Sequence, residues 1–371
     1  MNSLVIQSIE VILRYRFEQN ANVNKLTDLL KLFFFLRLEA QTYFIENDER
    51  IELNAITKHS GVQAEMDKIT SLMEMLAPLD GSNATNLPGT AIYKEARYRG
   101  RQPFLYNQGI VLIGQGSKRV YLGNTIYDYN PETYLVVSVP IPAECEIHAS
   151  YEEPMFALMV DIDMGMLNRI INHMDEHIDH SLLKRREKHR GIYVAAISPM
   201  IKDVVLRLLS ALQSPIDSSV LGKGLVYELL FRIMCGENAA VLYALAMKNT
   251  KVAKIEKALK LIHSSYNAAM NVDSLAALVN MSPSAFHRAF SDVTASSPIQ
   301  YIKKIRLNKA RDMLQERGTR VSEAAFHVGY ESAAQFSREF KRYFGNSPSE
   351  CRNNVSGTTE PINFVTLDRS T

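Results

Sequence analysis

The sequence predicts a multidomain α+β fold: an N-terminal β-barrel or jelly roll with flanking helices, then an all-α domain with two helix-turn-helix units. Short β-rich runs separated by turns fill residues 89–161, helical periodicity follows over residues 162–247, and a helical unit is repeated near the C-terminus. The chain has 371 residues, 46% hydrophobic and 22% charged, which is enough for two or three domains with their own cores.

Residues 1–65 are expected to form a helical extension, and the same pattern continues over residues 66–76. Either the extension is an additional cap or dimerisation element, or translation starts further along the chain. The strongest apolar run, residues 32–38, is far shorter than the roughly 20 residues of a membrane-spanning helix. No membrane contact is expected. The apolar positions of the extension are Leu26, Leu29, Leu30, Phe33, Phe34 and Leu38.

Six runs within residues 89–161 read as strands because they are β-rich, short and evenly spaced. Gly114, Gln115 and Gly116 join two of them, so this glycine pair indicates a hairpin turn and not a phosphate-binding loop, which would open a helix. Strands of this length and spacing favour a small barrel or jelly roll. The predicted strands are residues 110–113, 118–122, 125–129, 134–139, 144–149 and 155–160.

Histidines give little support for a metal site. The β region contains one histidine, His148, so we expect no metal-dependent enzyme and no cofactor there. His173, His177 and His180 lie at ligand spacing on one helical face. Acidic residues accompany them, so a polar, solvent-facing helix is the main interpretation and a metal or pH-sensing role is the alternative.

Three helical segments are expected after the β region, at residues 164–177, 199–213 and 224–247. The basic run at residues 184–190 is interpreted as a solvated loop, and residues 248–254 as a linker. Residues 66–247 would together form a sensing and dimerisation domain. An apolar stripe in the third segment could pair two chains or pack on the barrel; its members are Leu225, Leu229, Leu230, Ile233 and Met234.

A repeat with a period of 50 residues relates residues 273–298 to residues 323–348. In each copy a short helix, a turn and a second helix are predicted. Asn271 caps the first helix of copy one, and Asn280 occupies a turn that needs a left-handed backbone; Gly329 does so in copy two. Ser282 and Ser332 cap the second helices. Ser282, Phe286, Arg288, Phe290, Ser297 and Pro298 recur as Ser332, Phe336, Arg338, Phe340, Ser347 and Pro348.

The outer faces of the second helices carry short, hydrogen-bonding or cationic side chains, as a helix in the DNA major groove requires. A solvated helix face is the alternative for any one of them. Arg288 and Arg338 are the strongest candidates because they recur at equivalent positions. The first face consists of Ser284, His287, Arg288 and Ser291, and the second of Ala334, Gln335, Ser337, Arg338 and Lys341.

Residues 298–317 read as one helix of about 30 Å between the two copies, a length that suits reading heads about one DNA turn apart on an asymmetric site. Lys303, Arg306 and Arg342 are candidate phosphate contacts, with simple solvation as the alternative for the helix cations. Residues 251–352 contain 16 Lys or Arg and 9 Asp or Glu, a net charge of +7, against −5 for the rest of the chain. Phosphate binding requires a basic surface of this kind.

These motifs resemble those of the AraC/XylS-type transcription regulators. The resemblance lies in residues 286–290 (FHRAF), 297–301 (SPIQY), 328–332 (VGYES), 335–340 (QFSREF) and 344–348 (FGNSP). Two departures are Asn280 and Ala295, which stand where the family usually has glycine. Ala295 tolerates a left-handed backbone poorly, so we expect that helix end to be shaped differently.

The resemblance extends to residues 114–120 (GQGSKRV) and 149–154 (ASYEEP), which look like the sensing domain of one AraC-type subfamily. It implies a cupin-like fold, a small-molecule effector of unknown identity, a homodimer through the helices beside the barrel, and contact with RNA polymerase. The resemblance also implies that the protein activates transcription rather than repressing it.

The sequence therefore predicts a sequence-specific, DNA-binding transcription regulator and not an enzyme. The alternatives are a cupin-like small-molecule enzyme fused to a DNA-binding unit, and a general nucleic-acid packaging protein. Cys145, Cys235 and Cys351 are scattered, which favours a reducing cytoplasm over a disulfide framework. Residues 353–371 are expected to be a flexible tail.

Overall fold

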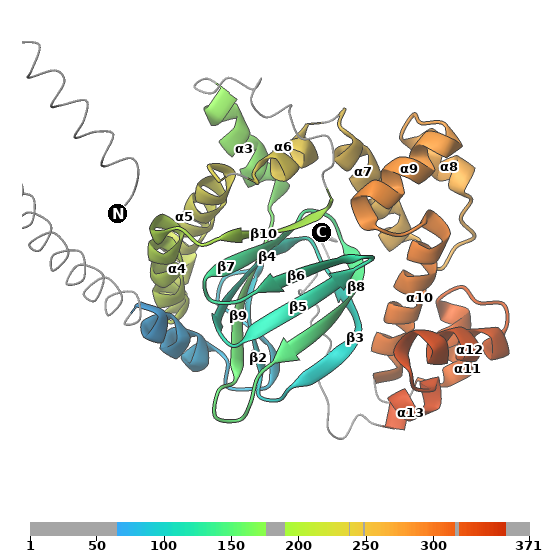
Figure 1. Ribbon diagram of the computed structural model, residues 1–371, viewed down its shortest axis with the longest axis horizontal. Coiled ribbons are helices and arrows are strands. Elements are labelled where there is room, and N and C mark those ends of the chain that lie inside the picture. The colour runs from blue at the N-terminus through green and yellow to red at the C-terminus, as the bar shows by residue number, and fades with distance from the viewer. Residues whose placement is uncertain (1–64, 176–189, 237, 248, 316–318, 354–371) are drawn as a thin grey trace, which may run out of the picture. The chain divides into compact units, whose positions relative to one another are not determined.

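The computed structural model describes residues 65–175, 190–236, 238–247, 249–315 and 319–353 (Figure 1). Residues 65–76 are helical, in agreement with the predicted pattern. The rest of the expected N-terminal extension, His177, His180 and residues 184–189 of the basic run lie outside the described residues, as does the tail from residue 354. The last residue of the basic run, Arg190, is described, and it is half-buried and donates a hydrogen bond to the Thr125 hydroxyl. No described helix is both long enough and apolar enough to span a bilayer.

The described part of the N-terminal domain contains two antiparallel β-sheets (Figure 1). The larger has the strand order β1-β2-β9-β4-β7-β10, and the smaller the order β3-β8-β5-β6. The two sheets are not joined into one closed barrel. The strands are β1 (Gly81–Ala84), β2 (Thr90–Glu95), β3 (Arg99–Tyr106), β4 (Gly109–Gln115), β5 (Ser117–Leu122), β6 (Thr125–Tyr129), β7 (Thr133–Val137), β8 (Ile141–His148), β9 (Met155–Asp161) and β10 (Ile192–Ala196).

The burial pattern of each strand shows which of its faces is covered. In β5, Lys118, Val120 and Leu122 are buried and alternate with more exposed residues, so one face of β5 points inward. In β4 and β9 nearly every residue is buried, because these central strands are covered on both faces. Residues of both sheets line one interior cavity, so the inner faces of the two sheets lie opposite each other.

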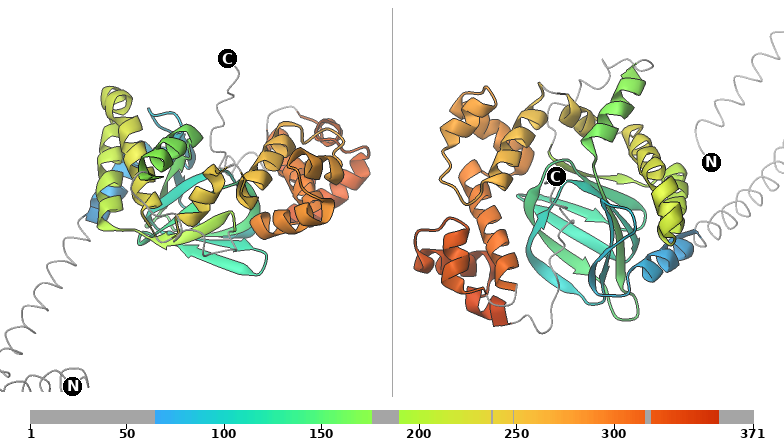
Figure 2. Two further views of the ribbon diagram at one scale, coloured as in Figure 1. Left: turned by 90° about the horizontal axis from the view of Figure 1, so that it is seen from above. Right: turned by 180° about the vertical axis from the view of Figure 1, so that it is seen from behind.

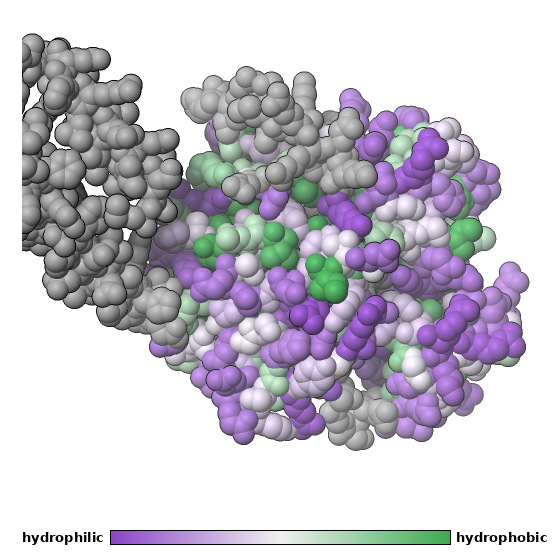
Figure 3. All heavy atoms as spheres, in the orientation of Figure 1, coloured by the Kyte–Doolittle hydropathy of each residue, from purple (hydrophilic) through white to green (hydrophobic). Residues whose placement is uncertain are grey.

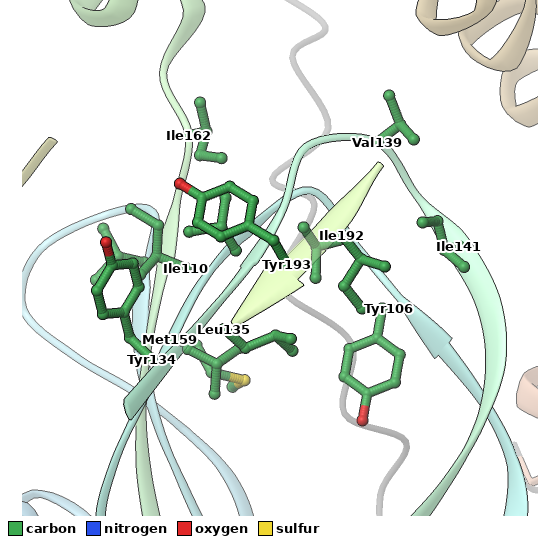
Figure 4. Close-up of a cluster of buried hydrophobic side chains, with 14 of the residues drawn as sticks. Tyr106, Ile110, Tyr134, Leu135, Val139, Ile141, Met159, Ile162, Ile192 and Tyr193 are labelled. Atoms are coloured by element: carbon green, nitrogen blue, oxygen red, sulfur yellow. The ribbon is translucent and has the colours of Figure 1, made fainter. Parts of the chain in front are cut away.

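The core between these elements is aliphatic and aromatic (Figure 4). Ile110 of β4, Met159 of β9 and Ile192 of β10 are almost completely buried there. Tyr134 and Tyr193 from the paired strands β7 and β10 pack edge to face, with ring centroids 6.5 Å apart. This packing joins β10 to the sheet, although β10 follows β7 by more than 50 residues.

Four strands were missing from the sequence prediction: β1, β2, β3 and β10. β3 contains Gly100 and Pro103, which argue against a strand, but it is an edge strand, where proline is tolerated. β10 is a five-residue strand between helices, and only its long-range pairing with β7 identifies it. The six predicted strands all occur, with ends shifted by up to three residues.

Helices α3 (Met164–Asp175), α4 (Pro199–Leu212), α5 (Pro215–Met234) and α6 (Ala240–Ala246) follow the strands. The expected helix at 224–247 is wrong: α5 starts nine residues earlier, where Ser214 caps it, and α6 is separate. Gly222 lies within α5, where Leu87 leaves no room for a side chain: a Cβ at Gly222 would come within 2.9 Å of Leu87 side-chain atoms. Of the predicted apolar stripe, Leu229, Leu230, Ile233 and Met234 are buried in the core.

The C-terminal domain is entirely helical in its described part. Its first helix begins at Lys251, within the segment expected to be a linker. In both Figure 1 and Figure 2, α10 runs between the pair α8–α9 and the pair α11–α12. The helices are α7 (Lys251–Ser264), α8 (Val272–Leu278), α9 (Pro283–Thr294), α10 (Pro298–Gln315), α11 (Val321–His327), α12 (Ala333–Phe344) and α13 (Pro348–Asn353).

Candidate nucleic-acid interface

Helices α8 and α9 form the first helix-turn-helix unit. Asn271 caps α8 by accepting a hydrogen bond from the backbone N–H of Asp273, and Ser282 caps α9 by accepting one from Ala285. Pro283 is the first residue of α9, where its missing N–H has no consequence. Phe286 and Phe290 are fully buried. The caps and the buried face agree with the sequence prediction.

Helices α11 and α12 form the second unit, and its core is the counterpart of the first. Ser332 caps α12 by accepting a hydrogen bond from the N–H of Gln335. Phe336 and Phe340 are fully buried, with ring centroids 5.4 Å apart, against 5.5 Å for Phe286 and Phe290. The two units therefore present α9 and α12 through the same local packing.

The turns of the two units share one hydrogen-bonding pattern but differ in length. Asn280 (φ 53°) and Gly329 (φ 84°) both have a left-handed backbone, as predicted. The next residue donates its N–H to a carbonyl five residues earlier in each case, at 3.0 Å. Ser282 caps α9 two residues after Asn280, whereas Ser332 caps α12 three residues after Gly329. The second turn is therefore one residue longer.

The expectation that α9 ends differently from α12 is wrong. Ala295 has a left-handed backbone (φ 52°, ψ 26°) and donates its N–H to the Ser291 carbonyl. Gly345 has φ 82° and donates to the Lys341 carbonyl in the same way. Alanine is held in this conformation because Ala295 packs on the hydrophobic core and the adjoining Thr294 and Ser296 are hydrogen-bonded to each other.

The outer faces of α9 and α12 are accessible. Ser284, His287, Arg288 and Ser291 are all exposed on α9. On α12, Ala334, Gln335, Arg338 and Lys341 are exposed, whereas Ser337 is half-buried and donates its hydroxyl to the Ala333 carbonyl. The visible surface of these helices is mostly hydrophilic, with isolated hydrophobic side chains (Figure 3). Arg288 and Arg338 make no hydrogen bond or ion pair with any described residue.

Glu339 is a residue of α12 that the sequence interpretation did not single out. It accepts hydrogen bonds from Lys303 Nζ at 2.9 Å, Tyr330 Oη at 2.9 Å and Gln335 Nε2 at 3.3 Å. Partial burial raises the pKa of Glu339, but these three hydrogen bonds outweigh it and the net shift is downward. Glu339 thus fixes the amide of Gln335 from behind the exposed face. The i,i+4 spacing of Gln335 and Glu339 is the feature of the sequence that could have predicted this contact.

The three candidate phosphate contacts differ in their surroundings. Arg342 is exposed on α12. Lys303 is half-buried and paired with Glu339. Arg306 of α10 donates three hydrogen bonds to backbone carbonyls: Nε to Tyr266 at 2.7 Å, Nη2 to Ala268 at 2.9 Å and Nη1 to Gly329 at 3.1 Å. Arg306 therefore joins the loop before α8 to the turn of the second unit.

Gly329 is required for space as well as for its backbone conformation. A Cβ at Gly329 would lie 2.4 Å from the backbone oxygen of Asn267, whereas one at Gly345 would meet nothing within 4 Å. We expect Gly329→Ala to lower the free energy of unfolding by about 3 kcal/mol, since it combines left-handed strain with overpacking. Gly345→Ala has the strain alone and should cost about 1 kcal/mol. Urea denaturation of both variants measures the difference, and equal losses would contradict the predicted clash.

A half-buried histidine should make the stability of this domain depend on pH. His263 Nε2 lies 2.8 Å from Tyr301 Oη, which donates to the Pro140 carbonyl at 2.8 Å, so His263 is the donor to Tyr301. Burial, together with Lys309, lowers the pKa of His263 to about 4. Between pH 6.5 and about 4 the unfolded chain binds a proton that the folded chain does not. The free energy of unfolding should therefore fall by about 2 kcal/mol from pH 7 to pH 5.

Denaturation of His263→Gln at the two pH values tests this origin, because glutamine keeps a donor but does not titrate. The pH-dependent loss should largely disappear in His263→Gln and persist in His287→Gln, which changes an exposed histidine. The same pH dependence in the wild type and in His263→Gln would show that other groups cause it.

Metal ligation has no support in the described part of the chain. No group of three or more His, Cys, Asp or Glu side chains is arranged there to hold a metal ion. His148 lies 3.5 Å from Glu146, and His173 is in the last turn of α3. The grouping of His173 with His177 and His180 falls partly outside the described residues.

Family comparisons match both halves of the chain. Residues 86–241 match the family described as AraC-type transcriptional regulator N-terminus, and residues 275–354 match a helix-turn-helix domain family. The Msm operon regulatory protein of Streptococcus mutans is 27% identical over 177 residues, which cover 47% of this chain and 61% of that protein. The RCS-specific HTH-type transcriptional activator RclR of Escherichia coli is 37% identical over 87 residues, 24% of this chain and 31% of that protein.

Among solved structures, that of unsaturated fatty acid-bound ToxT from Vibrio cholerae has the same fold, with a TM-score of 0.50. It is 13% identical, and the match covers 73% of this chain and 96% of ToxT. The chain spans less than two thirds of the two regulators above. With an AraC-type N-terminal domain before a pair of helix-turn-helix units, this chain belongs to the AraC/XylS-type transcription regulators.

Proposed function

We propose that this protein is a sequence-specific DNA-binding transcription regulator in which α9 and α12 each enter a major groove. The observation that carries the proposal is the pair of equivalent helices, each capped and buried in the same way and each with an exposed polar face. Arg288 and Arg338 occupy equivalent positions on these faces and have no partner among the described residues, so both are available for base edges.

The two units are held on one helix, which favours simultaneous binding. Helix α10 has 18 residues and is therefore about 27 Å long, and Arg306 joins its centre to both units. This length fits reading heads in successive major grooves about one turn apart. We assign phosphate contacts to Arg342 in preference to Lys303 and Arg306, because the latter two are engaged within the protein.

The N-terminal domain would supply regulation. We propose that a small molecule bound in the β domain changes how the DNA-binding helices are presented, and that the protein activates transcription in the cytoplasm through contact with RNA polymerase, as a homodimer or a monomer. Hydrogen bonds between the β domain and the DNA-binding helices offer a route for this change. Tyr301 of α10 donates to the Pro140 carbonyl, and Gly191, just before β10, donates its N–H to the Val293 carbonyl of α9 at 3.0 Å. Regulation requires that the effector bind two states with different affinity.

Selection from a randomised duplex pool by the purified full-length protein at moderate salt tests the proposal. Sequencing of the retained DNA should show a two-part motif with halves about 10 base pairs apart. Retention without any enriched motif, falling steadily as salt rises, would mean backbone-only binding and would refute sequence-specific reading.

A further inference from the structure

One lysine lies inside the N-terminal domain with its charge unbalanced. Lys118 is on the inward face of β5, between the two sheets, and is 5% exposed. Its ammonium lies over the ring of Phe104 at 4.2 Å and the ring of Tyr106 at 4.9 Å. Burial lowers the pKa of Lys118. A lysine so deeply buried normally has an anionic partner.

The protein does not supply that partner from its described residues. The charge of the Glu95 carboxylate acts on Lys118 and raises its pKa, although by less than burial lowers it. However, the oxygens of Glu95 already accept hydrogen bonds from Arg99 Nε at 2.8 Å, the Arg97 N–H at 3.2 Å and Tyr93 Oη at 3.4 Å. No ion pair joins Glu95 to Lys118. The neighbouring Cys145 does not compensate either, because burial raises the pKa of its thiol and keeps it neutral.

Two hydroxyl groups in the same cavity also lack acceptors. Tyr106 and Tyr129 are each 1% exposed. Burial raises the pKa of both phenols, so both are protonated. The Tyr106 hydroxyl lies near the Tyr129 hydroxyl and the Cys145 thiol, but neither hydroxyl makes a hydrogen bond of acceptable geometry with a described residue. Buried polar groups without partners are uncommon and carry a cost of about 1–3 kcal/mol each.

The remaining walls of the cavity are apolar. They combine aliphatic side chains of β4 with two methionines of β9, whose unbranched side chains adapt readily to a guest. The free space in this state is that of about one water molecule, so a larger guest requires the side chains of the cavity walls to move. The lining residues other than Lys118 and the two tyrosines are Tyr93, Phe104, Val111, Ile113, Met155, Ala157 and Met159.

We infer that this cavity binds a small, apolar monocarboxylic acid, with its carboxylate on Lys118 and the hydroxyls of Tyr106 and Tyr129 and its hydrocarbon part against β4 and β9. The ammonium of Lys118 and the two phenol hydroxyls can all donate to one carboxylate, and one anionic group balances one ammonium. A neutral sugar would leave the ammonium uncompensated and would place many hydroxyls against apolar walls. The inference rests on the proposed function, because it assigns the effector class to the regulatory domain.

Calorimetric titration of the full-length protein, without DNA, tests this assignment. Benzoate and octanoate serve as probes, with benzyl alcohol and raffinose as neutral comparisons. We expect at least one carboxylate to bind and both neutral compounds to bind at least 10-fold more weakly. Lys118→Met should weaken carboxylate binding about 100-fold or more, and Tyr129→Phe about 5-fold. Lys94→Met, which changes a half-buried lysine outside the cavity, should leave binding unchanged.

Thermal denaturation separates lost binding from lost folding. Lys118→Met removes an unpaired buried charge, so without ligand its Tm should equal or exceed that of the wild type. No binding of either carboxylate to the wild type, or equal binding to a folded Lys118→Met variant, would overturn the inference. The titration contains no DNA, so absence of carboxylate binding would not contradict sequence-specific DNA binding. Likewise, a DNA selection that enriches no motif would not contradict carboxylate binding.

Discussion

Replacing Arg306 with methionine is expected to lower the free energy of unfolding by about 4 kcal/mol. Three backbone carbonyls, those of Tyr266, Ala268 and Gly329, lose a charged donor, and each such hydrogen bond contributes about 1.5 kcal/mol or more. Methionine fills much of the volume but donates nothing. Urea denaturation of the full-length protein, followed by circular dichroism, measures the change.

Arg342→Met is the matched control, since it removes the same charge from an exposed position in the same domain. It should change the free energy of unfolding by less than about 0.5 kcal/mol. Arg306→Lys should recover part of the loss, because lysine keeps the charge but cannot reach three carbonyls in the same fork geometry. A loss below about 1 kcal/mol for Arg306→Met would show that water replaces the guanidinium without difficulty.

The double variant Arg288→Ala/Arg338→Ala should bind its selected DNA at least about 30-fold more weakly than the wild type. Each arginine is expected to contribute about 1–3 kcal/mol through a base edge, so the two losses combine to at least 2 kcal/mol and more at the centre of that range. Both side chains are exposed, so folding should be unchanged. Fluorescence anisotropy at fixed salt measures the affinities of the singles and the double.

Comparison with Arg342→Ala distinguishes base reading from phosphate binding. That variant should weaken binding to selected and random duplexes alike and reduce the salt dependence by about one ion. The single variants Arg288→Ala and Arg338→Ala should instead relax sequence preference in different halves of the motif. If the sequence preference is unchanged in both single variants, these arginines contact the DNA backbone, and neighbouring residues of α9 and α12 read the bases.

Local signals in the sequence were sufficient for much of the C-terminal domain. The caps Asn271, Ser282 and Ser332 and the turn residues Asn280 and Gly329 each act within a few residues of their own position, so their roles can be predicted from sequence. The contacts of the exposed faces with DNA stay a prediction.

Features that depend on long-range contacts could not be predicted in this way. β10 exists because it pairs with β7, and Ala295 keeps a left-handed backbone because the core and its hydrogen-bonded neighbours hold it. Arg306 follows the periodicity of a solvated cation, yet its acceptors lie 23 to 40 residues away. Lys118 alternates with Arg119 in β5, and only the opposing sheet determines which of the two cations is buried.

In the DNA complex that we propose, the one-residue difference between the two turns would help to give each protein molecule a direction along the DNA. The two heads differ, because α9 and α12 are presented by turns of different length and carry different side chains, so the proposed two-part site is asymmetric. A bound monomer consequently has a defined leading and trailing end. Inverting its site would turn the N-terminal domain toward the opposite flank of the DNA, so a single site can encode the direction of transcription.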